Sequence, residues 1–199
     1  MNFFFFGDSI CFGQFISPHK IWINKLSQTM DDLYNDKITI INASVNGNTT
    51  RMALDRLQYD VLTHPIDFIY IQFGLNDCNF WEHDKGLPRI SEKEFKTNLD
   101  TIINKCKIYN LKNIFIGTNH KVNKYDIYNN NNIRYNNIIR EVSNYHNIIL
   151  IDHEINMNLF NPIEYLLPDN IHLNEYGHIQ YYNFSKWIIL KHIYYDLHT

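Results

Sequence analysis

Short apolar runs alternate along the chain with segments in which apolar residues recur every three or four positions. The runs predict buried strands, because they are apolar on both faces and are bounded by turn residues. The periodic segments predict amphipathic helices. The predicted strands are residues 3–6, 37–42, 67–73, 113–118 and 147–152.

Local signals place the helices between these strands. Ser17 and Pro18 have the order of an N-cap followed by a first helical residue, and Ser91 with Glu94 has the spacing of a capping box. We expect a further helix to begin in the asparagine tract at 129–132 and a final one near Asn174. Strictly alternating strands and helices predict a parallel sheet of about five strands, covered by helices on both faces.

Polar residues follow each predicted strand. They include Ser9 after the first strand, Gly47 in the loop after the second and Asn76 after the third. Because parallel strands end at the same edge of a sheet, these residues are expected to line one pocket there. The irregular stretch at 78–89 is expected to be an exposed loop beside it.

A serine in such a turn is a weak nucleophile unless a base removes its proton. Near the other end of the chain, Asp169 and His172 are three positions apart, so the carboxylate can bond one imidazole nitrogen while the other faces Ser9. An oxyanion formed at the acyl carbon needs donors. The candidates are the backbone N–H groups of Ser9 and Gly47 and the side-chain amide of Asn76.

These residues stand in four blocks, namely Gly7–Ile10, Gly47, Gly74–Asp77 and Asp169–His172. In order and spacing the blocks resemble those of the SGNH (GDSL-type) hydrolases. The resemblance implies a flavodoxin-like three-layer α/β/α sandwich, with Ser9, Asp169 and His172 as the catalytic triad. It also implies an oxyanion hole of Ser9, Gly47 and Asn76, and neither a metal nor an organic cofactor. Ile10 and Asn170 depart from the residues common at their positions.

Six further residues near the blocks are candidate substrate contacts: Asp8, Asn79, Trp81, Arg89, Asn119 and His120. An aromatic ring beside hydrogen-bonding groups suits a sugar ring, although Trp81 is equally consistent with a residue that covers the core. Asn119 and His120 follow a predicted strand, which fits either a pocket wall or an exposed polar loop.

The composition of the chain limits the number of domains, the partners and the cellular compartment that we expect. The chain has 199 residues, 45% of them hydrophobic, which suits one domain over residues 1–199. A formal net charge of -3 argues against a nucleic-acid partner. Cys11, Cys78 and Cys106 form no CxxC motif, and no secretory leader or membrane-spanning stretch is recognised, so we expect a cytoplasmic protein without stable membrane association.

Together these features predict a serine esterase that removes a short acyl group, above all acetyl, from a carbohydrate or another polar metabolite. Three alternatives stay open. A lysophospholipase or thioesterase would need an apolar acyl channel, and an O-acyltransferase would pass the acyl group from Ser9 to a sugar hydroxyl. A flavodoxin-like binding module would need no catalytic residues at all.

Overall fold

The computed structural model describes residues 1–111 and 113–198, with side chains to Asp196. Its centre is a five-stranded sheet in the order β2-β1-β3-β4-β5, and every neighbouring pair is parallel. Each strand lies within a residue or two of its predicted position. The strands are β1 (Asn2–Gly7), β2 (Thr39–Asn42), β3 (Phe68–Gln72), β4 (Asn113–Gly117) and β5 (Ile149–Ile151).

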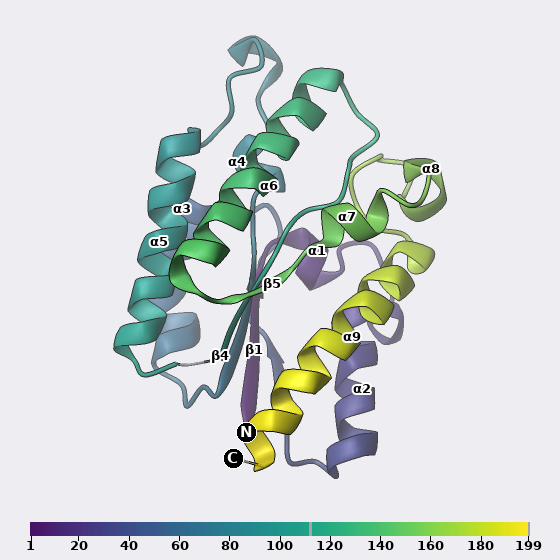
Figure 1. Ribbon diagram of the computed structural model, residues 1–199. Coiled ribbons are helices and arrows are strands. Elements are labelled where there is room, and N and C mark those ends of the chain that lie inside the picture. Colours follow the sequence, from purple (N-terminus) through teal and green to yellow (C-terminus); the bar gives the residue numbers. More distant parts are fainter. Residues whose placement is uncertain (112, 199) are drawn as a thin grey trace.

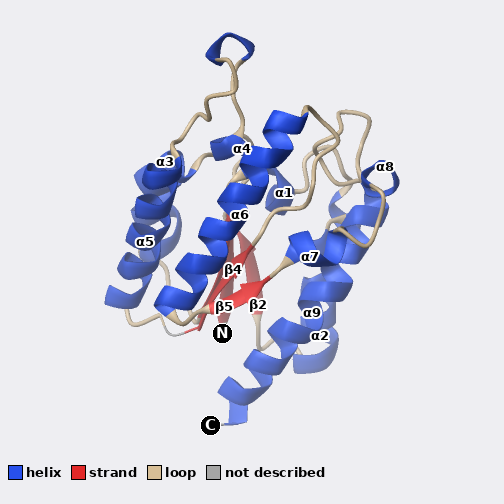
Figure 2. Ribbon diagram, turned by 45° about the horizontal axis from the view of Figure 1, so that its top comes forward, coloured by secondary structure: helices blue, strands red, loops and turns tan. Residues whose placement is uncertain are grey.

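Helices cover both faces of the sheet and complete three layers, as Figures 1 and 2 show. One face carries α2 (Trp22–Tyr34) and α9 (Glu175–His198), and the other carries α3 (Thr50–Leu57), α5 (Glu92–Ile108) and α6 (Asp126–His146). The described chain also has short helical segments: α1 (Ser9–Phe12), η1 (Pro18–Lys20), η2 (Gln58–Leu62), α4 (Leu75–Cys78), η3 (Glu82–Asp84), α7 (His153–Met157) and α8 (Pro162–Tyr165). This is the predicted α/β/α sandwich with a flavodoxin-like strand order.

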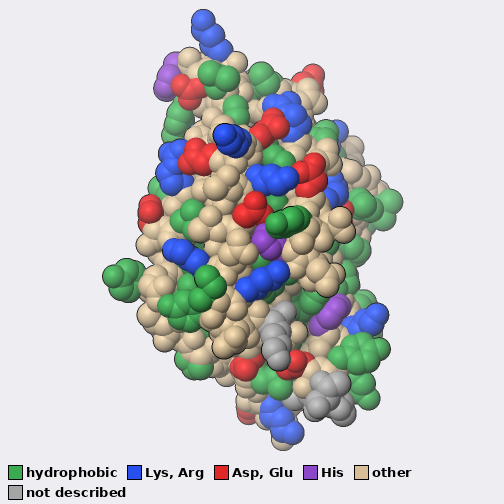
Figure 3. Space-filling view, turned by 60° about the vertical axis from the view of Figure 1, so that its left-hand side comes forward, with side chains coloured by type: hydrophobic (Ala, Val, Ile, Leu, Met, Phe, Trp, Pro, Cys, Tyr) green, Lys and Arg blue, Asp and Glu red, His purple; other side chains and the backbone are tan. Residues whose placement is uncertain are grey.

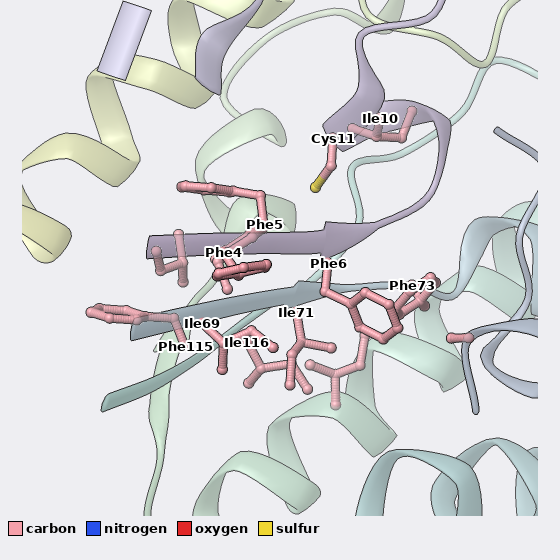
Figure 4. Close-up of a cluster of buried hydrophobic side chains, with 14 of the residues drawn as sticks. Phe4, Phe5, Phe6, Ile10, Cys11, Ile69, Ile71, Phe73, Phe115 and Ile116 are labelled. Carbon is pink, nitrogen blue, oxygen red and sulfur yellow. The ribbon is translucent and has the colours of Figure 1, made fainter. Parts of the chain in front are cut away.

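Strand β1 is the centre of the hydrophobic core, because its four phenylalanines are fully buried on two faces. Phe5 packs against Trp22 of α2 with ring centroids 5.4 Å apart. Phe6 packs on the opposite face against Phe73, at 5.3 Å. Figure 4 shows this alternation, with Phe5 and Cys11 on one side of the strand and Phe6 with Phe73 on the other.

Two predicted helix starts differ from the structure. Ser17 makes no capping bond through its side chain, and Pro18 opens the one-turn helix η1, so α2 begins only at Trp22. The asparagine tract at 129–132 lies inside α6, which already begins at Asp126. Buried amides of this tract bond backbone carbonyls of other segments: Asn131 donates to Cys78 at the end of α4, and Asn132 donates to His120.

Charged side chains of both signs are interspersed over the face that carries α3 and α5 (Figure 3). Several of them pair across helices, including Arg51 with Glu94 at 2.7 Å and Lys96 with Glu141 at 3.0 Å. This mixed face lacks the single-sign basic surface that nucleic acids require. Among the helices described, none combines the length and the apolar character needed to cross a bilayer.

The order in which the strands follow one another across the sheet reverses at β1, and the polar loops converge at this point. β2 lies on one side of β1 and β3 on the other, so the connections from their carboxyl ends separate and leave a crevice. The segments after β1, β2 and β3 carry Ser9, Gly47 and Asn76 respectively. The topology therefore brings three of the four sequence blocks to one point.

Candidate active site

Ser9 is the first residue of α1 and is separated from the end of β1 by Asp8 alone. Asp8 caps this helix, because its Oδ1 accepts from the backbone N–H of Ile10 at 3.0 Å. Gly13 ends the helix with φ of +79°, and a Cβ there would lie 2.5 Å from the side chain of Ile21. The turn thus holds Ser9 at the edge of the sheet with only 6% of its surface exposed.

His172 and Asp169 lie in the loop that leads into α9, and they meet Ser9 across the crevice. His172 Nε2 is 2.9 Å from Ser9 Oγ, and His172 Nδ1 is 2.5 Å from Asp169 Oδ2. Asn170 has φ of +62°, a conformation that asparagine tolerates better than most residues, so its departure from the family pattern leaves the turn intact. The structure therefore unites three residues from opposite ends of the chain.

The surroundings of Asp169 keep it ionised. Burial opposes ionisation, but hydrogen bonds from the His172 ring and from the N–H groups of Ile171 and His172 outweigh it and hold the pKa of Asp169 below its ordinary value. A carboxylate bonded to Nδ1 orients the ring, so that Nε2 is free to take the proton of Ser9. It also stabilises the imidazolium that this transfer produces.

Asn76 lies in α4, and its amide is held next to the Gly47 loop. Its Nδ2 donates to the carbonyl of Asn48 at 3.1 Å and to Asp8 Oδ2 at 3.3 Å. Gly47 has φ of +75°, which favours glycine, and a Cβ added there would meet open space. The two candidate oxyanion donors outside Ser9 thus lie on adjoining segments.

Two buried carboxyl groups support these segments from below. Asp77 Oδ1 accepts from the N–H and hydroxyl of Thr50 at 2.9 and 2.5 Å, which joins α4 to the first turn of α3. Burial raises the pKa of Asp77 to about 6. Burial, reinforced by repulsion from Asp77, raises the pKa of Asp8 to about 7. The carboxylates beneath the site are thus less acidic than ordinary ones.

Three of the candidate substrate contacts are excluded by burial. Asp8, Asn119 and His120 have no exposed surface. Asp8 caps α1, and Asn119 donates to the carbonyl of Phe73 at 2.9 Å. Neither expectation for Asn119 and His120 was right, because they form neither a pocket wall nor an exposed loop. A histidine directly after a strand gives no sequence signal that distinguishes these cases.

The other three candidates lie at or near the surface. Asn79 is half-buried and lines a cavity beside the site. Trp81 is 59% exposed and so does not cover the core. The guanidinium carbon of Arg89 lies 5.3 Å from the centroid of the Trp81 ring. Trp81 and Arg89 line a separate hollow together with Arg51, and none of these three residues lines the Asn79 cavity.

Phe15 is a neighbour of the site that the sequence did not reveal. Its ring is 72% exposed and stands edge-on to the His172 ring, with centroids 5.4 Å apart. Its φ of +68° is unusual for a bulky residue. The only sequence hint is its place in a turn between Gly13 and Pro18.

Within the part of the chain that the structure describes, no three His, Cys, Asp or Glu side chains are grouped in a way that could hold a metal ion. All three cysteines are buried and free of disulfide bonds.

The fold and site define a class: an α/β/α sandwich with a serine, a histidine and an aspartate hydrogen-bonded in series at the carboxyl edge of its parallel sheet. The chain belongs to the GDSL-like Lipase/Acylhydrolase family, whose model matches residues 5–179.

Among curated proteins, an arylesterase of Vibrio mimicus is 30% identical over 101 residues, which are 51% of this chain and 46% of that protein. The uncharacterized lipoprotein YqeF of Bacillus subtilis (strain 168) is 32% identical over 95 residues, or 48% and 37% of the two chains. The matches thus span less than half of either relative's length.

Solved structures share the fold over nearly the whole chain. A lipase/acylhydrolase from Enterococcus faecalis aligns with a TM-score of 0.81 and 23% identity, over 94% of each chain. Axe2, an acetylxylan esterase from Geobacillus stearothermophilus, aligns with a TM-score of 0.78 and 20% identity, over 92% of this chain and 91% of that one. At these identities the likeness establishes the architecture.

Proposed function

We propose that this protein is a serine esterase that hydrolyses short O-acyl esters, above all O-acetyl esters, of a carbohydrate or a similar polar metabolite. One observation carries the reaction class: Ser9 Oγ lies 2.9 Å from His172 Nε2, while His172 Nδ1 lies 2.5 Å from Asp169. Such a series is the arrangement by which a neutral hydroxyl becomes a nucleophile at neutral pH.

The geometry suits a two-step mechanism. Ser9 Oγ attacks the acyl carbon as His172 Nε2 takes its proton, and the resulting oxyanion is bonded by the N–H groups of Ser9 and Gly47 and the amide of Asn76. His172 then protonates the departing alcohol, which leaves an acyl ester on Ser9. Water attacks that ester with His172 again as base, and collapse of the second intermediate returns the proton to Ser9 and releases the carboxylic acid. Asp169 stays ionised throughout.

A cavity beside the site supports a polar, ring-shaped alcohol as the leaving group. It has a volume of about 630 Å³ and touches the site at Ile171, which precedes His172, and at Asn79, which follows the helix of Asn76. Phe80, Tyr125 and Lys124 also line it. Aromatic rings beside amide and ammonium donors are groups that hold a sugar ring, and the neighbour of Ile171 in the chain is the proton donor His172.

The relatives agree with this choice without determining it. Axe2 is described as an acetylxylan esterase, and the Vibrio mimicus protein as an arylesterase. The three buried, unpaired thiols support a reducing compartment, and we place the protein in the cytoplasm on that basis.

Two assays test the proposal. The first compares kcat/KM for p-nitrophenyl acetate, butyrate and decanoate, with Ser9→Ala as the blank; we expect acetate to be the best substrate. The second measures acetate release from O-acetylated oligosaccharides, with and without an added sugar acceptor. Preference for decanoate would favour a lysophospholipase or thioesterase, and acetyl transfer to the acceptor in place of acetate release would favour an acyltransferase.

A further inference from the structure

A buried histidine lies directly beneath the loop that carries His172, and the mechanism does not use it. His120 Nε2 is 2.8 Å from the carbonyl of Ile171, and its Nδ1 is 2.8 Å from the hydroxyl of Tyr181. A carbonyl only accepts, so Nε2 carries the hydrogen. Burial lowers the pKa of His120 to about 4, so at neutral pH Nδ1 is bare and accepts from Tyr181. The partners therefore fix a single tautomer.

The bond from His120 completes the restraint on the peptide unit before His172. Its carbonyl, on Ile171, accepts from His120, and its N–H, on His172, donates to Asp169 Oδ1 at 3.0 Å. A peptide unit is planar, so holding both ends fixes its orientation. That orientation sets the direction in which the His172 ring projects toward Ser9.

The same hydrogen bonds continue to the helix that carries the nucleophile. The Tyr181 hydroxyl is 3.5 Å from Gln72 Nε2, and Gln72 Oε1 accepts from Cys11 Sγ at 3.2 Å. Cys11 lies in α1, two residues after Ser9. All of these side chains have no exposed surface. A continuous buried series of polar groups thus joins the Ser9 helix to the His172 loop through the sheet.

We propose that His120, held by Tyr181, is a positioning residue that keeps His172 within hydrogen-bonding distance of Ser9. The inference rests on the proposed serine mechanism, and it adds a function for residues that touch no substrate. A purely structural network would affect stability alone. A positioning network also affects the chemical step, because misplacing a catalytic group by about 1 Å can cost about 100-fold in rate.

Tyr181→Phe tests the proposal, because it deletes the hydroxyl and keeps the ring, which stacks on His153 with centroids 3.8 Å apart. Tyr70→Phe is its matched control. The Tyr70 side chain is equally buried and its hydroxyl is 2.9 Å from His153 Nε2, so it also bonds a buried histidine. Among the residues that the structure describes, that histidine makes no hydrogen bond to the His172 loop. We expect a similar, small fall in Tm for both variants. Only Tyr181→Phe should lower kcat, by about 10-fold or more at unchanged KM.

A second measurement does not depend on the identity of the natural substrate. The rate at which an alkyl fluorophosphonate labels Ser9 reports its activation by His172. Labelling should slow in Tyr181→Phe as much as kcat falls, and it should stay at the wild-type rate in Tyr70→Phe. Equal kcat and equal labelling in the two variants would overturn the positioning role. Failure of the wild type to be labelled at Ser9 would instead overturn the proposed function.

A further pair covers the case in which Tyr181→Phe does not fold. In His120→Gln the amide nitrogen takes about the place of Nε2 and can still donate to the Ile171 carbonyl, whereas His120→Leu cannot. We expect His120→Gln to retain several-fold more kcat and a faster labelling rate than His120→Leu. Equal rates in these two variants would contradict the proposal.

Discussion

The phenylalanines toward the amino end of β1, Phe3 to Phe6, and the turn at its carboxyl end, Gly7 to Ser9, are both buried but contact different kinds of group. At the amino end, Phe3 stacks on Phe5 with ring centroids 4.7 Å apart, and the surroundings are apolar. At the carboxyl end come Gly7, Asp8 and Ser9, which are buried too but bond to Val45, Asn76 and His172 from three other parts of the chain. Burial alone therefore does not identify a functional residue. The hydrogen-bond partners of the buried group do.

The carboxyl end carries a cost in stability that the amino end offsets. Burial raises the pKa of Asp8 to about 7, which means that its ionised form is disfavoured in the folded protein. The phenylalanine rings stabilise the fold without supplying any polar group. We therefore expect substitutions at the two ends to separate activity from stability.

The largest effect should come from Ser9→Ala at the carboxyl end. Loss of the nucleophile is expected to lower kcat by roughly 10⁴-fold or more. The free energy of unfolding should hardly change, because one small hydroxyl is removed. Ester hydrolysis and urea denaturation of the same preparation measure both quantities. A variant that keeps its turnover would revive the binding-module alternative.

Phe5→Ala at the amino end should show the reverse. It leaves a cavity between Trp22 and Tyr70, whose ring centroids both lie 5.4 Å from that of Phe5, and should lower the free energy of unfolding by about 3–5 kcal/mol. Activity per folded molecule, counted by fluorophosphonate titration, should stay near the wild-type value. Phe5→Leu leaves a smaller cavity and should lose less stability. A fall in kcat without a fall in stability would break the comparison.

Asn76→Ala removes one proposed oxyanion donor at the carboxyl end. We expect kcat to fall by roughly 10²–10³-fold, equivalent to about 3–4 kcal/mol, with KM little changed. The matched control is Asn79→Ala, which removes a nearby amide that lines the cavity and should act on KM for sugar esters. Steady-state kinetics on both variants would detect the split, and equal kcat values would remove Asn76 from the oxyanion hole.

His153 is a buried polar residue outside β1, and its contribution to the free energy of unfolding depends on pH. Burial lowers its pKa to about 3, so the unfolded chain takes up a proton below its own pKa of about 6.5 that the folded chain refuses. Stability is thus lost as the pH falls from about 6.5 toward 3. Between pH 7 and 5, wild type should lose about 2 kcal/mol relative to His153→Phe.

Urea denaturation of both proteins at each pH measures this difference, and the titration of Asp8 and Asp77 cancels because both proteins carry them. A stability difference that is independent of pH would mean that His153 takes up its proton equally in the folded and the unfolded protein.

Phe15 should give the smallest effect. Phe15→Gly relieves the positive φ and removes the ring beside His172, so Tm should stay the same or rise while kcat/KM falls about fivefold, equivalent to about 1 kcal/mol. Phe15→Ala removes the ring but keeps the strained backbone, so it should lose both activity and stability. Equal Tm values for the two variants would show that this turn stores no strain.

Apolar patterning was sufficient to predict the sheet. All five strands were found because each is a short, mostly apolar run, although the edge strands β2 and β5 are only partly buried. The family blocks pointed to the loops that follow the strands. The start of α6 was placed too late because Asn131, Asn132 and Asn136 occupy its inner face. Their amides donate to backbone carbonyls. Because these residues are buried but polar, a search for hydrophobic residues at helical spacing does not find them.

The residues around the triad were predicted less well than the triad residues themselves. Ser9, His172 and Asp169 stand in short motifs, and the resemblance of these motifs to the SGNH hydrolase blocks implied that the three residues meet. The burial of His120 depends on where α9 packs, since Tyr181 of that helix covers it, and no local pattern encodes this. Phe15 owes its position beside His172 to tertiary packing in the same way.

The central claim is that Ser9 is made nucleophilic by His172, and covalent labelling tests it most directly. Wild type and His172→Gln are each treated with an alkyl fluorophosphonate, digested and analysed by mass spectrometry over time. We predict one adduct per molecule on the peptide that contains Ser9, formed at least about 100-fold more slowly in His172→Gln. An adduct on another residue, or equal rates in the two proteins, would contradict it.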